Sequence, residues 1–577
     1  MRIKATWPIW KKSVIITSQT LKTEGLKEFT INWSTEDDWF LQNQLFVDKG
    51  HWYGGAEIAE QHWPIENVTM PLKPYIGSGF YEAVLERYWF SSQKVAIVVP
   101  DDVPLWFSQN GPTKTWVFKA QYVNSVYANF VNDAVAKPFL KYKIIVPIST
   151  KTTLAEFHLK VLNRFFDKPT GLPDLKMMQF PIWSSWVIYY ENINQQKVLQ
   201  FARGIVDNNF SRSQMEIDNG WEVSPTGDLK VDQKKFPNIT HMVKELAEMG
   251  FDTTLWVHQF LNYGTKAVNT VKKNYLVQPC TREPFTSGWM KSEPAWIPWW
   301  MGVGASVDIT NLEAANWFVN RLEKIRKDFG VYSFKFDAGE ATWLGGCFKL
   351  HNASYPNQFS EIFAKQAARL GNAIEVRVGS RSQALPVFHR VLDRSFAWGY
   401  NSGLQGLLAS SLLFGIIGYP FVLPDQIAGG SPKDEELFIR WVQALTFMPA
   451  MEFSSRPWVI SKRANKVAKR MLAERQKYFP YLESVAKESI RTGAPIMRPL
   501  WWADESEMAL TSDSQYLIGD KLLVAPILAP NQNSRPVYIP PGVWEGQIDG
   551  QLFTGPVTIE QKVSLEQLAF YLKLKDV

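Results

Sequence analysis

Two aspartates, Asp337 and Asp393, each close a short and mainly apolar run of the sequence. Such runs are typical of buried parallel strands, and barrel enzymes place their chemistry at the carboxyl ends of these strands. Two carboxylates that face one cleft suit the cleavage of a glycosidic bond, because one can attack the anomeric carbon while the other, kept protonated, donates to the leaving oxygen. A separation of roughly 5–5.5 Å would make the reaction retaining. The alternative for Asp337 is a helix cap without a chemical role.

Other side chains at predicted strand ends could complete such a site. Asp218 and Asp425 follow two further runs, and Arg377 ends the run that lies between those of the two aspartates. An arginine in this place can hold a carboxylate or a sugar hydroxyl through two hydrogen bonds. Trp256 and Trp398 could stack on the apolar face of a sugar, and packing in the core is the alternative for each ring.

Strand-end carboxylates also suit Mg²⁺ or Ca²⁺, which gives a second hypothesis, a metal-dependent barrel enzyme. Such a site wants a lysine or histidine base, and Lys335 lies two residues before Asp337, on the same side of its strand. The seven histidines show no pair at ligand spacing, and the only two cysteines, Cys280 and Cys347, are not in a C-x-x-C motif. The sequence therefore favours a site without a metal or a cofactor.

The acids lie in a part of the chain where short apolar runs alternate with helical stretches. Eight such strands with intervening helices over about 300 residues indicate a (β/α)8 barrel. An open doubly wound sheet is the alternative, and it is weakened because no G-x-G-x-x-G follows a strand. The predicted strands are residues 182–189, 214–218, 254–258, 333–337, 373–377, 390–393, 417–423 and 450–453. The predicted helices are residues 196–207, 239–249, 313–329, 358–370, 403–413 and 435–445.

The 577 residues are too many for one hydrophobic core, so a multidomain protein of mixed α/β and β class is expected. Residues 1–170 carry short runs split by turn residues, which predicts an amino-terminal β-sandwich. Residues 171–490 form the predicted catalytic barrel, with an insertion near 260–330 that is rich in proline and tryptophan. Residues 491–577 return to β patterning and predict a second, smaller β-sandwich domain.

Cysteines and glycosylation sequons bear on the compartment. Cys280 lies in the insertion and Cys347 just after the fourth predicted strand, so both fall on one face of the barrel. A disulfide between them is one expectation, and two free thiols are the other. No signal peptide or membrane span is visible in the sequence, whereas glycosylation sequons are typical of secretory proteins. Both observations are compatible if an amino-terminal anchor or signal was removed or never included. The N-x-S/T sequons, which together indicate the secretory pathway, are at Asn32, Asn67, Asn209, Asn238 and Asn352.

The charge pattern gives no sign of a nucleic-acid partner. The net charge of +6 comes from 62 basic and 56 acidic residues, and these form no basic block. The 46% of apolar residues and 20% of charged residues argue against a disordered chain. The 25 tryptophans fit a sugar-binding cleft, although core packing must account for most of them.

Several motifs spread along nearly the whole chain resemble those of glycoside hydrolase family 31. The run KFDAGE matches the family's nucleophile motif, and Arg377 and Asp393 show the spacing of 16 residues between the family's arginine and acid/base. The run WYGGAE looks like its amino-terminal loop, PDQIAGG like the segment after its seventh strand, and the last strands like its distal β domain. The matching segments are residues 52–57, 227–238, 335–340, 424–430, 518–526 and 538–544.

The resemblance implies a retaining α-glycoside hydrolase that works by double displacement, with Asp337 as the nucleophile and Asp393 as the acid/base. It also implies an oligosaccharide or glycan substrate and no cofactor. The substrate-binding residues expected from the resemblance and from the strand-end reasoning together are Glu57, Asp218, Trp256, His258, Lys335, Arg377, Trp398 and Asp425.

Three departures from the α-glucosidases of the family bear on the substrate. The nucleophile motif reads F-D-A-G-E where they carry W-x-D-M-N-E, the acid/base lies in L-D-R where they carry G-D, and a histidine common in their eighth strand is replaced near Phe453. These variant motifs are most similar to the animal myogenesis-regulating glycosidase branch, which implies α-galactosidase activity towards an α-linked galactosyl-glucose unit. The alternatives are an α-glucosidase or α-xylosidase of the same family, and a catalytically silent carbohydrate-binding or chaperone-like homologue.

The same branch implies a type II membrane protein of the endoplasmic reticulum lumen, and an extracellular protein is the alternative. The membrane contact would then be made only through an anchor absent from this sequence, and the first part of the amino-terminal sandwich would be absent with it. The oligomeric state is left open, with a homodimer among the possibilities.

Overall fold

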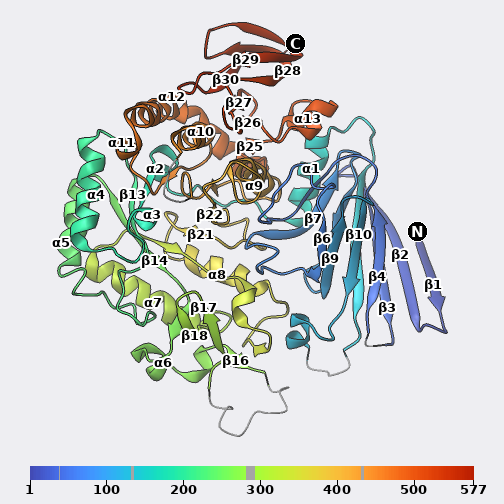
Figure 1. Cartoon of the computed structure of the whole chain (residues 1–577). Helices are drawn as coiled ribbons and strands as arrows, with labels where there is room; N and C mark the ends of the chain where they lie inside the picture. Colours follow the sequence, from blue (N-terminus) through green and yellow to red (C-terminus); the bar gives the residue numbers. More distant parts are fainter. Residues whose placement is uncertain (38, 132–135, 281–292, 430–433, 577) are drawn as a thin grey trace.

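The structure is a computed structural model that describes residues 1–577 except 38, 132–135, 281–292, 430–433 and 577. Three parts follow one another along the chain. The amino-terminal strands lie on the right of Figure 1, the barrel occupies the centre and left, and the last strands form a sheet at the top. The predicted architecture, a barrel flanked by two β-rich parts, is confirmed.

Two antiparallel sheets form the amino-terminal part and share one apolar core, in which Trp89, Phe107 and Trp116 are fully buried. Trp116 packs edge-on against Trp52, with 4.8 Å between the ring centroids, so tryptophans help to fill this core, as was expected for most of them. The seven-stranded sheet has the order β1 (Arg2–Trp7), β2 (Lys12–Leu21), β3 (Leu26–Thr35), β11 (Phe139–Pro147), β8 (Ala96–Val98), β7 (Leu85–Ser91) and β5 (Trp52–Ala56). The four-stranded sheet has the order β4 (Leu41–Phe46), β10 (Thr115–Ala120), β9 (Leu105–Asn110) and β6 (Met70–Pro74).

Eight short parallel strands form the barrel, and the second to the seventh of them each pair with the barrel strand that precedes them along the chain. The last strand returns to pair with the first, and a parallel bridge between Gln426 and Glu452 brings the two remaining edges together, so the ring is nearly closed. The strands are β12 (Ile182–Ser184), β13 (Gln214–Ile217), β14 (Asp252–Val257), β19 (Ser333–Phe336), β21 (Glu375–Val376), β22 (Phe388–Arg390), β23 (Val422–Leu423) and β24 (Glu452–Phe453).

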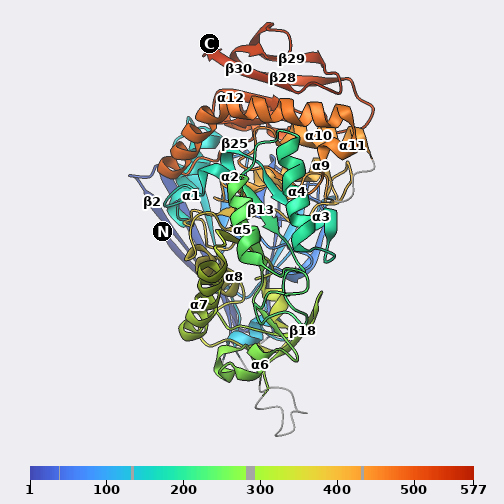
Figure 2. The same cartoon turned by 90° about the vertical axis from the view of Figure 1, so that its left-hand side faces the viewer.

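Helices cover the barrel, as Figure 2 shows for the ones between β12 and β21. Most of them are amphipathic, whereas the helix Leu404–Ile416 is mainly apolar and buried on all sides. The apolar faces of the amphipathic helices are buried. In the helix Gln195–Asp207, for example, Val198, Phe201 and Ile205 face the core. The helices between strands are α4 (Gln195–Asp207), α5 (Ile239–Glu248), α7 (Leu312–Phe329), α8 (Gln358–Ala368), α9 (Leu404–Ile416) and α10 (Glu435–Leu445).

The predicted strands 373–377 and 450–453 are too long, since β21 and β24 have 2 residues each, and the predicted strand 390–393 is displaced, since β22 ends at Arg390. Two further predicted strands include residues that belong to a helix or to the turn after one. In the predicted strand 182–189, β12 ends at Ser184 and helix α3 (Trp186–Tyr189) follows. In the predicted strand 417–423, the first residues complete the end of α9, and only Val422–Leu423 is strand. Both errors have one cause, since a continuous apolar run is compatible with a buried strand and with a buried helix.

The predicted insertion adds small sheets beside the barrel. Strand β16 (Gln278–Pro279) pairs with β20 (Phe348–Lys349), and next to this pair Cys280 and Cys347 form a disulfide with their Cα atoms 5.3 Å apart. Residues 281–292 of the insertion lie outside the described residues, as does Gly430 of the motif 424–430. A three-stranded sheet is formed by β15 (Phe260–Asn262), β18 (Gly302–Ser306) and β17 (Trp296–Trp299).

The long helix α12 (Lys462–Thr492) runs between the barrel and the carboxyl-terminal sheet (Figure 2). That sheet has a second core of its own, which contains Val537, Ile539 and Trp544. Its strands, in order, are β25 (Met497–Arg498), β26 (Tyr516–Ile518), β27 (Leu522–Ala525), β30 (Ala569–Lys575), β28 (Ser534–Gly546) and β29 (Leu552–Lys562).

Four of the five sequon asparagines are exposed, and Asn32 on β3 is half-buried. Asn238 accepts a hydrogen bond from the backbone of His241 and caps α5. Within the part of the chain that the structure describes, no helix combines the length and the apolar character needed to cross a bilayer. The exposed sequon asparagines are Asn67, Asn209, Asn238 and Asn352.

Candidate active site

A cavity of about 390 Å³ lies at the carboxyl ends of the barrel strands, where the predicted acids converge. This volume suits a small ligand such as one sugar unit. Seven of the ten residues predicted for catalysis or binding line this cavity. Most of the predicted residues therefore lie close together in the structure. The lining residues are Trp186, Glu191, Asp218, Asn219, Trp256, Trp300, Lys335, Asp337, Arg377, Arg390, Asp393, Arg394, Asp425, Gln426 and Gly429.

Asp337 follows β19 and is held by three donors. Trp256 Nε1 donates to its Oδ2 at 2.9 Å, while the backbone N–H of Ala338 and Arg377 Nη1 lie 2.9 and 3.1 Å from its Oδ1. Burial would raise the pKa of this carboxyl, but Arg377 and Arg390 outweigh burial, so the pKa of Asp337 is lowered. Asp337 is therefore an ionised and fixed carboxylate, with a side chain that is 14% exposed.

The backbone just after Asp337 explains the small residues of the motif. Ala338 has a φ of 61° and Gly339 a φ of 92°, so the chain turns sharply in the left-handed region. A Cβ on Gly339 would come within 2.4 Å of the Phe363 ring, so the turn leaves no room for a side chain there.

Asp393 lies opposite and is the more accessible of the two, with a side chain that is 69% exposed. Arg390 Nη1 donates to its Oδ1 at 2.6 Å, and Arg377 Nη1 lies 3.7 Å from its Oδ2. Burial at the cavity wall would raise the pKa of Asp393, but these two arginines hold it well below its usual value.

Arg377 joins the two carboxylates and fixes their spacing. Because its Nη1 is 3.1 Å from an Asp337 oxygen and 3.7 Å from an Asp393 oxygen, those oxygens lie no more than about 6.8 Å apart, near the roughly 5–5.5 Å of retaining glycosidases and below most of the inverting range. Arg377 is itself anchored by Glu340, whose Oε1 accepts from Nε at 2.6 Å. Trp300 lies over the guanidinium, 5.7 Å from it to the ring centroid.

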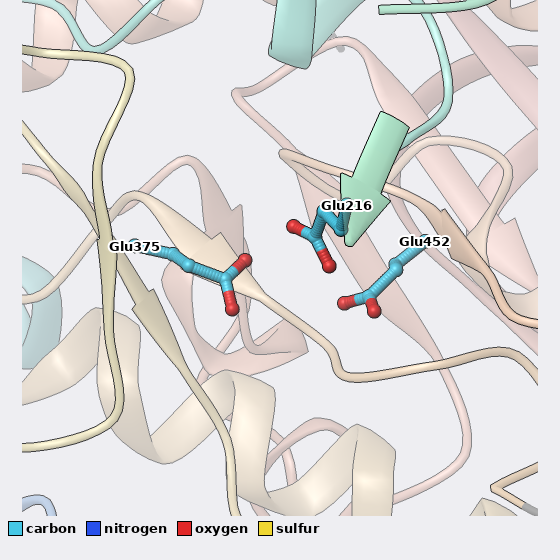
Figure 3. Close-up of side chains that lie close together, drawn as sticks. All are labelled: Glu216, Glu375 and Glu452. Atoms are coloured by element: carbon cyan, nitrogen blue, oxygen red, sulfur yellow. The ribbon is translucent and has the colours of Figure 1, made fainter. Parts of the chain in front are cut away.

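The floor of the cavity is a buried cluster of charges around Lys335. Its ammonium lies 3.0 Å from Glu216, 3.1 Å from Glu452, 3.4 Å from Glu375 and 3.7 Å from Asp218. Figure 3 shows the three glutamates pointing toward one another from β13, β21 and β24. Their oxygens lie within 4.8 Å of one another, a spacing that suits a metal ion, but the lysine ammonium already supplies the compensating positive charge there.

Burial and mutual repulsion act on the acids of this floor. Burial raises the pKa of Glu216 well above its usual value, and Glu375 and Glu452 add to the shift, which Lys335 only partly offsets. Burial also raises the pKa of Asp218 to about 6. The carboxylates in turn raise the pKa of Lys335, which burial alone would lower, so the lysine is charged and part of the acids are protonated.

Asp425, after β23, belongs to the same network. Arg390 Nη1 lies 3.2 Å from its Oδ1, and the backbone N–H of Arg394 donates to its Oδ2 at 2.7 Å. Burial raises the pKa of Asp425 to about 7, against the opposing effect of Arg390.

Three predicted binding residues do not line the cavity. Glu57 is fully buried behind it, where it pairs with Arg394 and accepts a hydrogen bond from the backbone N–H of Leu392 at 3.1 Å. His258 packs behind Trp256, and burial lowers its pKa to about 3. Trp398 packs against the main hydrophobic core. A role of these three residues in substrate binding stays a prediction.

Several lining residues escaped the sequence analysis. Arg390 begins the predicted strand 390–393 but is the last residue of β22, and Trp186 lies in a predicted strand but begins helix α3. An alternation signal was present for the floor, since Glu216 and Glu375 each precede a predicted site residue by two. Arg394, Gln426 and Gly429 lie inside motifs that carry the family resemblance, and Trp300 lies in the tryptophan-rich insertion, whereas no comparable signal marks Glu191 and Asn219.

Comparisons with known proteins agree with this geometry. The family model described as the TIM-barrel domain of glycosyl hydrolases family 31 matches residues 175–485, and that of the family's C-terminal domain matches residues 493–575. The mouse myogenesis-regulating glycosidase is 37% identical over 546 residues, which cover 90% of this chain and 74% of the relative. The SITS-binding protein of Tetronarce californica is 28% identical over 581 residues, which cover 93% and 76%. The crystal structure of a family 31 α-xylosidase from a soil metagenome, complexed with xylose, has the same fold with a TM-score of 0.77 at 18% identity, over 99% of this chain and 91% of that one.

Proposed function

The chain belongs to glycosyl hydrolase family 31, and we propose that it is a retaining α-glycosidase that hydrolyses O-glycosyl bonds by double displacement. The observation that carries the proposal is the pair Asp337 and Asp393, bridged by Arg377 at the mouth of the barrel. Their separation of at most about 6.8 Å leaves room for a sugar carbon between them and little room for an added water.

Asp337 is assigned as the nucleophile because it is ionised, held by three donors and least free to move. Its carboxylate attacks the anomeric carbon, the bond to the leaving oxygen breaks, and Asp393 gives that oxygen its proton. Water then attacks the anomeric carbon of the ester and gives a proton back to Asp393, and Asp337 departs as a carboxylate. Two inversions at one carbon retain the α configuration.

The rest of the cavity is assigned to binding. Lys335 and Asp218 on the floor offer a donor and an acceptor to sugar hydroxyls, and the Trp186 and Trp300 rings offer stacking surfaces at the wall. The finer proposal, an α-galactosidase, rests on the departures from α-glucosidase motifs at residues 335–340 and 392–394. The similarity to the myogenesis-regulating glycosidase supports this direction.

A panel of aryl α-galactoside, α-glucoside and α-xyloside tests the proposal and its specificity. We expect turnover with Asp337→Asn lowered by roughly 1,000-fold or more, because the carboxylate assigned to form the ester is removed. The matched control is Asp207→Asn, an exposed aspartate at the end of α4. NMR should show the α-anomer as the first product. An undiminished rate with Asp337→Asn, or an initial β-anomer, would refute the mechanism, and binding without hydrolysis by the wild type would favour a silent carbohydrate-binding protein.

We also propose that the protein works in the secretory pathway, in the endoplasmic reticulum lumen. A disulfide between Cys280 and Cys347 and four exposed sequons fit an oxidising compartment. Endoglycosidase H treatment of the protein from animal cells should increase its mobility on a denaturing gel. Unchanged mobility would contradict this assignment and leave the glycosidase proposal untouched.

A further inference from the structure

Arg390 stands between two carboxylates at the cavity mouth. Its Nη1 lies 2.6 Å from Asp393 Oδ1 and 3.2 Å from Asp425 Oδ1, and its side chain is 4% exposed. One nitrogen of Arg390 thus contacts both acids. The sum of the two distances shows that Asp393 Oδ1 and Asp425 Oδ1 lie no more than about 5.8 Å apart, with the arginine as their shared hydrogen-bond donor.

This arrangement conflicts with the role proposed for Asp393. An acid/base must carry a proton when the substrate arrives, yet a carboxylate paired with an arginine keeps its charge. The pKa of Asp393 is lowered by Arg390 and Arg377, whereas burial raises the pKa of Asp425 to about 7. In the free site Asp425 therefore holds a proton more readily than Asp393 does.

We propose that Asp425 is a positioning residue that controls the protonation of Asp393, with Arg390 pairing with one of these two carboxylates at a time. The inference deepens the proposed function and rests on it. In the resting arrangement Arg390 pairs with ionised Asp393. In the donor arrangement Arg390 pairs with ionised Asp425, and Asp393 holds the proton. The exchange moves one proton from an Asp425 oxygen to an Asp393 oxygen through the solvent of the cavity, so the net charge of the site does not change.

The two acids differ in freedom as this exchange requires. Asp425 is fixed, because its backbone has a φ of 58°, its Oδ2 accepts from the backbone N–H of Arg394, and its side chain is 5% exposed. Asp393, at 69% exposure, can turn from the arginine toward a leaving oxygen. The charged groups that face Asp425 are Arg390 from β22, Asp393 after it, Lys335 from β19 and Glu452 from β24. Those that face Asp393 are Arg390, Arg377, Lys335, Asp337 and Asp425.

Asp425→Asn tests the exchange, because asparagine keeps the shape and the acceptor oxygen but removes the competing charge. Asp393 then remains the only charged partner of Arg390 Nη1 among the described residues and stays ionised. We expect kcat/KM for methyl α-galactoside, whose leaving group needs a proton, to fall roughly 100-fold or more. For 2,4-dinitrophenyl α-galactoside, whose leaving group needs none, we expect the fall in kcat/KM to be at least about tenfold smaller than for the methyl glycoside. The alkaline limb of the methyl glycoside profile should move to lower pH, because loss of a nearby negative charge lowers the pKa of Asp393.

A second variant gives the opposite sign. Arg390→Lys keeps a positive charge but loses the planar fork, which weakens the pairing with Asp393, so the alkaline limb should move to higher pH. Equal losses on both substrates with an unmoved pH profile in Asp425→Asn would overturn the inference, since Asp425 would then only shape or bind. A limb that does not rise in Arg390→Lys would overturn it as well. A wild type inactive on all three α-glycosides would instead refute the proposed function.

Discussion

Replacing Lys335 by methionine tests the electrostatic account of the cavity floor. The ammonium lies 3.0 Å from Glu216, 3.1 Å from Glu452 and 3.4 Å from Glu375, and the side chain is 3% exposed. Methionine keeps the length and removes the charge. Removing one partner of a buried ion pair costs about 3–5 kcal/mol, because the remaining charges lose their compensation. We expect the free energy of unfolding to fall by about 3–5 kcal/mol at pH 8.

The loss should depend on pH, and its sign follows from the raised pKa values of the floor. A carboxyl group whose pKa is higher in the folded state than in the unfolded state does not lower the stability while the pH is below its unfolded pKa. That unfolded pKa is 4.5 for Glu216. The cost appears as the pH rises from there to the folded pKa, because the folded state must keep a proton that the unfolded state releases. Without Lys335 the folded pKa of each glutamate rises further. The difference between variant and wild type should therefore be small at pH 5 and large at pH 8.

Urea unfolding followed by tryptophan fluorescence at the two pH values measures this difference. Lys327→Met, at an exposed position in α7, is the matched control and should leave the midpoint unchanged. The double variant Lys335→Met, Glu216→Gln should regain part of the loss, with a coupling of roughly 0.5–3 kcal/mol, because one stranded carboxylate is gone. If Lys335→Met keeps the wild-type midpoint at both pH values, the carboxylates do not need the lysine and the account of the floor is wrong.

Three further predictions concern the surroundings of the site. Cys280→Ser should lower the free energy of unfolding by up to about 4 kcal/mol, because its disulfide to Cys347 links residues that are 67 positions apart in the chain. Thermal unfolding without reductant measures this loss, and an unchanged transition temperature would contradict the prediction. Trp300→Ala should raise KM roughly tenfold with kcat little changed, because a ring at the cavity wall is lost; steady-state kinetics with an aryl glycoside decide, and a fall in kcat alone would oppose the assigned role. Glu57→Gln should destabilise the protein by about 3–5 kcal/mol, as it strands the buried Arg394; a wild-type melting temperature would argue against this pairing.

The barrel and its acids were predictable from the sequence for a geometric reason. All strands of a parallel barrel end at one rim, so an acid that closes an apolar run is brought to the others whatever the loops do. Asp218, Asp337 and Asp425 line one cavity for this reason. The same rule does not reach Glu57, His258 or Trp398, whose places depend on how loops pack behind the rim.

The floor could have been predicted in part and was not. Side chains two residues apart on a strand point the same way, so Glu216 must face inward if Asp218 does, and Glu375 must if Arg377 does. Which ion pairs form, such as the pair of Arg390 with Asp393, depends on differences of a few tenths of an ångström between nitrogen–oxygen distances. The spacing of residues along the chain does not predict such differences.

The floor and the mouth of the cavity are one electrostatic unit. Glu375 lies 3.4 Å from Lys335 and 3.6 Å from Arg390, and Arg390 lies 2.6 Å from Asp393. A change of charge at position 335 alters how strongly Glu375 attracts Arg390. It therefore also alters how strongly Arg390 pairs with Asp393. The two departures from the α-glucosidase motifs, a lysine two residues before Asp337 and the L-D-R segment around Asp393, are therefore linked physically, and one is not expected to work without the other.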